Sequence, residues 1–146
     1  METVQEYTLK ATPTGVTLSA SKITSSDDVQ KFMRGFWGDD ILIYESFFLL
    51  VLNRGNVPIG WAKISQGGIS GTVVDVRILM KFVIDLLGTS VIVAHNHPSG
   101  ALRPSTQDLQ LTSKLKEGLK MLDIELIDHI ILTKDDYYSL ADNNYL

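Results

Sequence analysis

The segment from Ser90 to Gly100 reads SVIVAHNHPSG and contains the clearest structural signal of the chain. Its first half is a short apolar run rich in β-branched residues, which is typical of a buried strand. His95 and His97 stand at the end of that run. Because residues i and i+2 of a strand point to the same face, both imidazoles can contact one ion. The stretch therefore predicts a strand that delivers two histidines to a single site.

A turn and a helix start follow the second histidine. Pro98 and Gly100 supply turn residues. Ser105 stands where a helix N-cap belongs, and Asp108 follows three residues later, which predicts a helix from about 106 to 121. Strand, loop and helix start thus bring two imidazoles and one carboxylate together. Three nitrogen and oxygen ligands, with a fourth position left for water, describe a catalytic zinc site.

These residues, together with several later ones, resemble a known family. The spacing of H-x-H, seven residues and S-x-x-D is that of the JAMM (MPN-type) metalloprotease motif, and the wider match is to the RadC family. The matching segments are AHNHPSG at 94–100, Pro104-Ser105 with Asp108, LIDH at 126–129 and YYSL at 137–140. The resemblance covers roughly residues 21 to 142 and is specific, because several separated motifs occur in the right order.

The resemblance implies roles for five residues. JAMM proteins are similar to one another in using two histidines and one aspartate as zinc ligands, a glutamate as base and a serine that helps hold the reacting oxygen. Carried over, His95, His97 and Asp108 are the metal ligands, and Glu45 and Ser105 are the catalytic residues. The implied cofactor is one Zn²⁺ per chain, and the implied reaction is hydrolysis of a peptide or isopeptide bond. Ligand type alone would also allow iron, cobalt, nickel or manganese.

Each of these residues also has a structural interpretation. Ser105 is a preferred N-cap residue, and Asp108 can close a capping box while the helix dipole keeps it ionised for a metal. Glu45 precedes the apolar run 47–52, where a carboxylate needs a partner or a task. His129, in Asp128-His129, resembles the family's Asp-His pair, which leaves open a role as a further metal ligand or as a support for a ligand. It is interpreted as a core or sheet-face histidine and is left out of the site.

Composition favours one globular domain. The chain has 146 residues, of which 45% are hydrophobic, and a net charge of −4. This acidic balance does not favour nucleic acid as a partner of this domain alone. The chain has no cysteine, which excludes disulfides, thiol catalysis and a deaminase type of zinc site.

The N-terminal residues indicate where the protein resides. They lack a basic and apolar leader pattern, and no stretch long enough to span a bilayer is free of charge. We therefore expect no signal peptide, no membrane association and a cytoplasmic location. We expect a peptide or protein as substrate. An exposed sheet edge would also allow a homo-oligomer.

The coarse pattern predicts a weakly patterned segment at 1–20 and a RadC-like JAMM/MPN domain at 21–146. Its fold class is α/β, with a mixed central sheet flanked by about three helices in a cytidine-deaminase-like architecture. The expected helices cover 26–38, 76–87 and 106–121. The expected strands cover 41–52, 57–65, 90–94, 124–132 and 137–140, and two short strands, around 4–9 and 16–23, are weaker expectations.

The sequence departs from the RadC pattern at two places. We expect no N-terminal helix–hairpin–helix region, and Asp75-Val76-Arg77 replaces His-Pro-Arg at the start of the middle helix. Two other functions stay open. One is a non-catalytic module associated with DNA repair or DNA processing, although no feature of the sequence supports that association. The other is a hydrolase that acts on a nucleic acid or a small amide.

Overall fold

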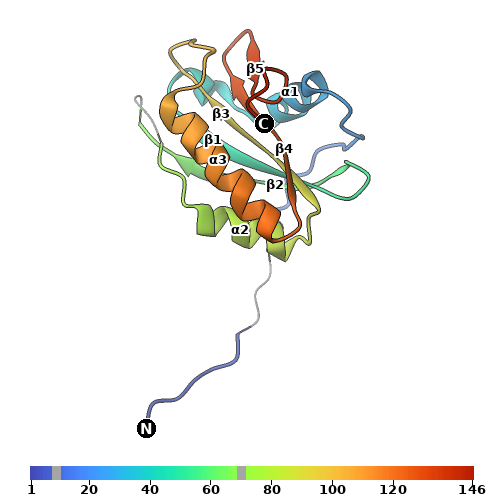
Figure 1. The fold of residues 1–146 in the computed structure, drawn as a ribbon, viewed down its shortest axis with the longest axis vertical. Coiled ribbons are helices and arrows are strands. Elements are labelled where there is room, and N and C mark those ends of the chain that lie inside the picture. The colour runs from blue at the N-terminus through green and yellow to red at the C-terminus, as the bar shows by residue number, and fades with distance from the viewer. Residues whose placement is uncertain (8–10, 69–71) are drawn as a thin grey trace.

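A five-stranded sheet forms the centre of the molecule (Figure 1). The computed structural model describes residues 1–7, 11–68 and 72–146. In chain order the elements are α1 (Ser26–Arg34), a 3-10 turn (Asp39–Leu42), β1 (Ser46–Leu52), β2 (Pro58–Gln66), α2 (Val76–Asp85), β3 (Ser90–Asn96), α3 (Thr106–Met121), β4 (Glu125–Leu132) and β5 (Tyr137–Ser139).

The sheet is mixed, with strand order β2-β1-β3-β4-β5. β1 is antiparallel to both of its neighbours. β3 and β4 are adjacent parallel strands, and the helix α3 connects them in the chain. β1 and β3 are buried along their whole lengths, as expected for central strands that are covered on both faces. The α/β fold class, the mixed sheet and the three helices predicted from the sequence are confirmed.

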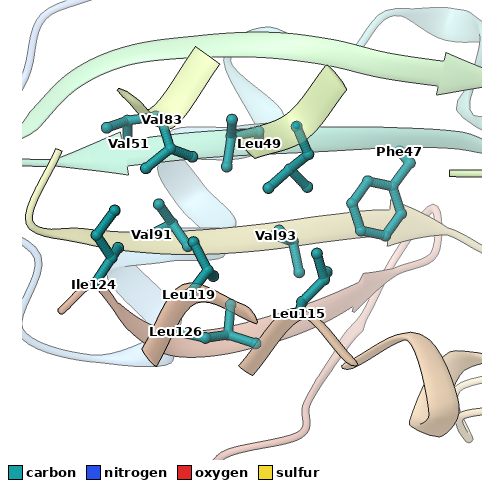
Figure 2. Packing of buried hydrophobic residues seen from close by; sticks show 11 residues of the cluster. Phe47, Leu49, Val51, Val83, Val91, Val93, Leu115, Leu119, Ile124 and Leu126 are labelled. Carbon is teal, nitrogen blue, oxygen red and sulfur yellow. The ribbon is translucent and has the colours of Figure 1, made fainter. Parts of the chain in front are cut away.

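Alternation along the central strands divides the core into two layers. Val91 and Val93 of β3 pack with α2 and α3, and Figure 2 shows this cluster between the helices and the sheet. Ile92 and Ala94 point to the other face and pack against Val29 and Met33 of α1. His95 continues the first row, so its side chain lies on the α2/α3 face.

Three sequence-based expectations were wrong in detail. The described residues 1–7 and 11–22 contain no strand, because the weak apolar pattern there has no partner strand; the part of that expectation on 8–10 lies outside the described residues. The run 41–52 divides into a 3-10 turn and a strand that begins only at Ser46. α1 ends at Arg34, four residues before the expected Gly38.

Candidate metal centre

Four polar side chains from separate parts of the chain converge at the C-terminal end of β3. Glu45, His95, His97 and Asp108 each offer one ligand atom, and these atoms lie within 4.8 Å of one another. Glu45 immediately precedes β1, the two histidines flank the end of β3, and Asp108 lies in the first turn of α3. All four residues proposed from the sequence as ligands or base are therefore brought together.

The end of β3 fixes the two histidines. His95 is almost fully buried, at 2% exposure, and its Nε2 lies 2.8 Å from Nε2 of His97. The backbone N–H of His97 donates to the carbonyl of Leu132 at 2.9 Å. Its ring Nδ1 lies 2.6 Å from the carbonyl oxygen of Ala101. Because a carbonyl oxygen only accepts, Nδ1 of His97 carries the hydrogen, and Nε2 of the neutral ring presents a lone pair to the cluster.

Asp108 belongs to the cluster and to a helix cap at once. Its two carboxylate oxygens lie 3.3 Å from Nε2 of His95 and 3.4 Å from Nε2 of His97. One of them also accepts from the backbone N–H of Ser105 at 2.8 Å, while the Ser105 hydroxyl oxygen accepts from the N–H of Asp108 at 3.1 Å. The predicted capping box is confirmed. It uses a lone pair of the Ser105 hydroxyl and leaves the O–H proton out of the cap.

Glu45 is held by its backbone at the edge of the cluster. Its carbonyl accepts from Gly67 at 2.9 Å and its N–H donates to Gly68 at 3.4 Å, which extends the pairing of β1 with β2 beyond the strand. Its side chain is 17% exposed, and Oε1 lies 3.8 Å from Nε2 of His95. Phe47, two residues on, lies on the same face, with its ring centroid 6.1 Å from that of His95. The carboxylate therefore lies between the buried ring of His95 and solvent.

The charges of the cluster support one another. Burial by itself would raise the pKa of Asp108, but hydrogen bonds from His95 and His97, formed when their Nε2 atoms carry a proton, and from the Ser105 backbone N–H hold that pKa well below its usual range. Burial likewise disfavours the charged form of His97, yet the hydrogen bonds to Asp108 and to the Ala101 carbonyl outweigh it and raise the pKa of His97. Asp108 is therefore an anion that attracts a positive charge, either a proton or a metal cation.

The donor set fits a zinc ion. Two atoms bound to one tetrahedral zinc at about 2.0–2.1 Å lie roughly 3.3 Å apart. The distances from Asp108 to the two imidazoles, 3.3 and 3.4 Å, match this value, and the distance of 2.8 Å between the imidazoles is shorter. Two imidazole nitrogens and a carboxylate are ligands that zinc accepts, and Asp108 is ionised as a ligand must be.

Comparison with known proteins agrees with this arrangement. A family model described as RadC-like JAB domain matches residues 23–145, which is most of the chain. The chain belongs to this family. The RadC-like JAB domain is 44% identical over 125 residues to a UPF0758 protein of Flavobacterium johnsoniae, covering 86% of this chain and 54% of the relative. It is 38% identical over 124 residues to a UPF0758 protein of Staphylococcus haemolyticus, covering 85% and 54%. The chain thus spans about half the length of these curated relatives.

Two residues that support this site of the RadC-like JAB domain were left out of the site predicted from the sequence. His129, interpreted as a core or sheet-face histidine, is indeed fully buried, but its Nε2 lies 2.7 Å from Nδ1 of His95. Burial lowers the pKa of His129 well below its ordinary value, so the ring is neutral. The parallel pairing of β3 with β4 could have placed it there, but a register shift between Val91 and Ile92 hides the alignment.

Asn96 is the second missed residue. It is fully buried on the opposite face from the two histidines, and its amide nitrogen donates to the carbonyls of Ile41 and Tyr44 at 2.7 and 2.8 Å. Its amide oxygen accepts from the N–H of Ser46 at 2.8 Å. Asn96 thus ties the end of β3 to the segment that carries Glu45. Its partners are backbone groups, so no side-chain pattern in the sequence indicates them.

An apolar cavity of the RadC-like JAB domain lies elsewhere. It has a volume of about 660 Å³ and is lined by the N-terminal segment 11–20, by β2 and by Phe82 and Leu86 of the α2 region. None of the four cluster side chains lines it, so the cluster itself is the basis for assigning chemistry. Within the part of the chain that the structure describes, no helix has the length and apolar character needed to cross a bilayer.

Proposed function

We propose that this domain is a zinc-dependent hydrolase that cleaves a peptide or isopeptide bond. The observation that carries the proposal is the convergence of a carboxylate base candidate with two imidazoles and a second carboxylate within 4.8 Å. Three of the four, His95, His97 and Asp108, form the proposed ligand set. Such a three-ligand set leaves a coordination position open, as catalytic zinc sites do, whereas structural sites are closed by four protein ligands.

The ion and the protein divide the chemistry. A zinc ion in such a site supplies a Lewis acid and lowers the pKa of a water molecule to about 7. The protein holds the donors in place before any ion arrives, because Asp108 is fixed by the helix cap and His97 by the Ala101 carbonyl. Little reorganisation is therefore needed when the ligands engage.

Glu45 is the proposed proton carrier. It lies beyond the ligands, with its carboxylate 3.8 Å from Nε2 of His95 and partly open to solvent. In this position it accepts a proton from the attacking water and delivers it to the leaving nitrogen of the substrate amide. The backbone hydrogen bonds of Glu45 with residues 67–68 hold the main chain from which this carboxylate extends.

Ser105 is the proposed oxyanion donor. Its hydroxyl oxygen is engaged in the helix cap as an acceptor, so its O–H can donate to the oxygen that becomes negative when the carbonyl is attacked. The N-terminus of α3, which begins at this residue, favours negative charge at the same place. Both features stabilise a transition state more than the neutral substrate.

The proposal is tested by comparing two glutamate variants. Glu45→Gln should retain zinc and lose turnover of a peptide library by at least about a hundredfold, the lower range for general acid–base catalysis. Glu125→Gln, at the start of β4 and exposed, makes the same chemical change at the opposite end of the sheet and should be fully active. Full activity of Glu45→Gln with zinc bound would remove Glu45 from the mechanism.

Metal content distinguishes the hydrolase from a non-catalytic module. The wild type should contain about one zinc per chain, and His97→Ala should lose it. Salt-dependent DNA binding by a protein that takes up no metal would favour the alternative of a module in DNA processing. The division into a segment 1–20 and a domain 21–146, the cytoplasmic location, the identity of the peptide or protein substrate and a homo-oligomeric state stay predictions from the sequence.

A further inference from the structure

The third histidine of the chain forms a buried connection between two of the proposed ligands. Nε2 of His129 lies 2.7 Å from Nδ1 of His95, and Nδ1 of His129 lies 2.6 Å from the hydroxyl oxygen of Thr112. That hydroxyl in turn donates to the backbone carbonyl of Asp108 at 2.6 Å. His129 and Thr112 are 0% and 2% exposed, so water does not replace these partners.

The directions of these hydrogen bonds follow from the chemistry of the groups. Thr112 has a single hydroxyl hydrogen, and the Asp108 carbonyl, which cannot donate, receives it. The Thr112 oxygen can then only accept from His129, so Nδ1 of His129 carries a hydrogen. A neutral imidazole carries one ring hydrogen, so Nε2 of His129 accepts. The hydrogen between the two rings therefore belongs to Nδ1 of His95.

This placement of the hydrogen determines the state of the other ring nitrogen of His95, Nε2. With its hydrogen on Nδ1, the neutral ring has its lone pair on Nε2, the atom 2.8 Å from His97 and 3.3 Å from Asp108. His97 reaches the same state by another route, because its Nδ1 donates to the Ala101 carbonyl. The ring of His97 is thus oriented by a backbone carbonyl of the following loop, and the ring of His95 by two buried side chains.

We propose that His129 is a positioning residue of the metal centre. By accepting the Nδ1 hydrogen of His95, it keeps Nε2 of His95 as the ligating atom. Through Thr112 it also joins His95 on β3 to the first turn of α3, which carries Asp108. The inference rests on the proposed function in one respect, since it assumes that the cluster binds a metal ion. Partners of this kind typically contribute ten- to a hundredfold to metal affinity.

A core histidine without this role would need only to have its two nitrogens satisfied. Two variants of the full chain separate the interpretations. His129→Gln keeps one acceptor for His95 and one donor for Thr112, because its amide carries both groups. His129→Leu keeps apolar volume and removes both. Thr112→Ser and Thr112→Val form a matched second pair, since serine keeps the hydroxyl and valine removes it.

The first measurement is zinc affinity, determined by competition with a chromogenic chelator. His129→Leu should bind zinc about ten- to a hundredfold more weakly than the wild type, and His129→Gln should recover most of the loss. Thr112→Val should weaken binding and Thr112→Ser should not. Equal affinities for the wild type and a folded His129→Leu would overturn the proposal. If the leucine variant does not fold, equal affinities of Thr112→Val and Thr112→Ser would overturn it.

The second measurement reads the hydrogen positions directly. In metal-free protein labelled with ¹⁵N-histidine, the three histidines of the chain give a spectrum that can be assigned with single variants. The expected pattern is a hydrogen on Nδ1 of both His95 and His129. A hydrogen on Nε2 and none on Nδ1 of His95 would overturn the positioning role. Failure of the wild type to bind zinc would overturn the proposed function, and with it the metal part of this inference, whereas a change confined to the histidine variants tests His129 alone.

Discussion

The side-chain amide of Asn96 donates to the carbonyl of Tyr44 at 2.8 Å, and Tyr44 is the residue immediately before Glu45. A residue that lies between two ligand histidines in the sequence therefore holds the segment that carries the proposed base, although Tyr44 lies 52 residues earlier in the chain. The two faces of β3 thus have different roles. His95 on one face belongs to the cluster, and Asn96 on the other face binds the segment that precedes Glu45.

Asn96→Ala should destabilise the protein and reduce activity more than metal binding. The variant removes one buried and two partly buried hydrogen bonds, to the Ser46 N–H and to two carbonyls, which we expect to cost about 2–4 kcal/mol of unfolding free energy. Urea unfolding measures the cost. Zinc affinity should stay within a few fold, because no ligand contacts this amide, and a loss of zinc as large as in His97→Ala would contradict this assignment.

Ser105 variants should separate the helix cap from catalysis. Ser105→Ala loses one cap hydrogen bond and should lower the unfolding free energy by about 1 kcal/mol. Ser105→Gly also lacks the hydroxyl, but glycine is tolerated at an N-cap, so it should cost only roughly a few tenths of a kcal/mol. If the hydroxyl donates to the oxyanion, both variants should lose turnover with zinc retained. Normal turnover in Ser105→Gly would assign the serine to the cap alone.

Zinc binding and metal-free stability should respond to pH in opposite directions. The pKa of His97 is raised above 6.5, so protons compete with zinc already on the alkaline side of that value, and zinc affinity should fall as the pH is lowered through it. In metal-free protein the same shift contributes stability that is fully present below pH 6.5 and is lost as the pH rises through the folded-state pKa. Asp108 acts in the opposite sense only below pH 3.8.

Chelator competition and urea unfolding of metal-free protein, from about pH 5.5 to pH 8.5 around the ordinary histidine pKa, measure the two responses. His97→Gln is the control, since glutamine does not titrate and should remove the His97 contribution to the metal-free curve. Coincident pH profiles of wild type and control would show that His97 has no raised pKa in the folded protein.

Arg34→Met should destabilise the fold without affecting the metal centre. The guanidinium of Arg34, at the end of α1, donates to the carbonyls of Thr133, Lys134 and Asp136 at 3.0, 3.2 and 2.9 Å and so holds the turn between β4 and β5. Methionine keeps the apolar stem, and we expect a loss of about 1–2 kcal/mol in unfolding free energy. Unchanged zinc affinity is expected, and a weakened one would mean that this turn is coupled to the cluster.

The sequence was most informative where one local pattern determines geometry. The strand period places His95 and His97 on one side, and the serine–aspartate spacing starts a helix, so three ligands could be predicted without knowing the sheet. Glu45 required the family resemblance, because its distance from His95 depends on the antiparallel pairing of β1 with β3. Local patterns contain no such pairing.

The missed contacts have the same physical origin. His129 meets His95 only through the parallel pairing of β3 and β4, and the irregularity in that pairing changes which residues face one another. Asn96 bonds to backbone carbonyls, which every residue possesses, so no side-chain pattern announces its partners. The strands expected near the N-terminus were wrong for a related reason, since alternation over a few residues does not supply a neighbouring strand.

The capping box at the start of α3 has a consequence for how such a protein matures. Asp108 is held by Ser105, His97 by Ala101 and His95 by His129, so each proposed ligand has a partner within the polypeptide. Folding can then run to completion first and loading can follow, in contrast to small zinc domains that remain unfolded until they are loaded. A preformed site of this kind can lose its metal to a chelator and bind metal again while the protein stays folded. The fraction of sites that hold metal would then depend on the free metal concentration and not on the conditions under which the chain folded.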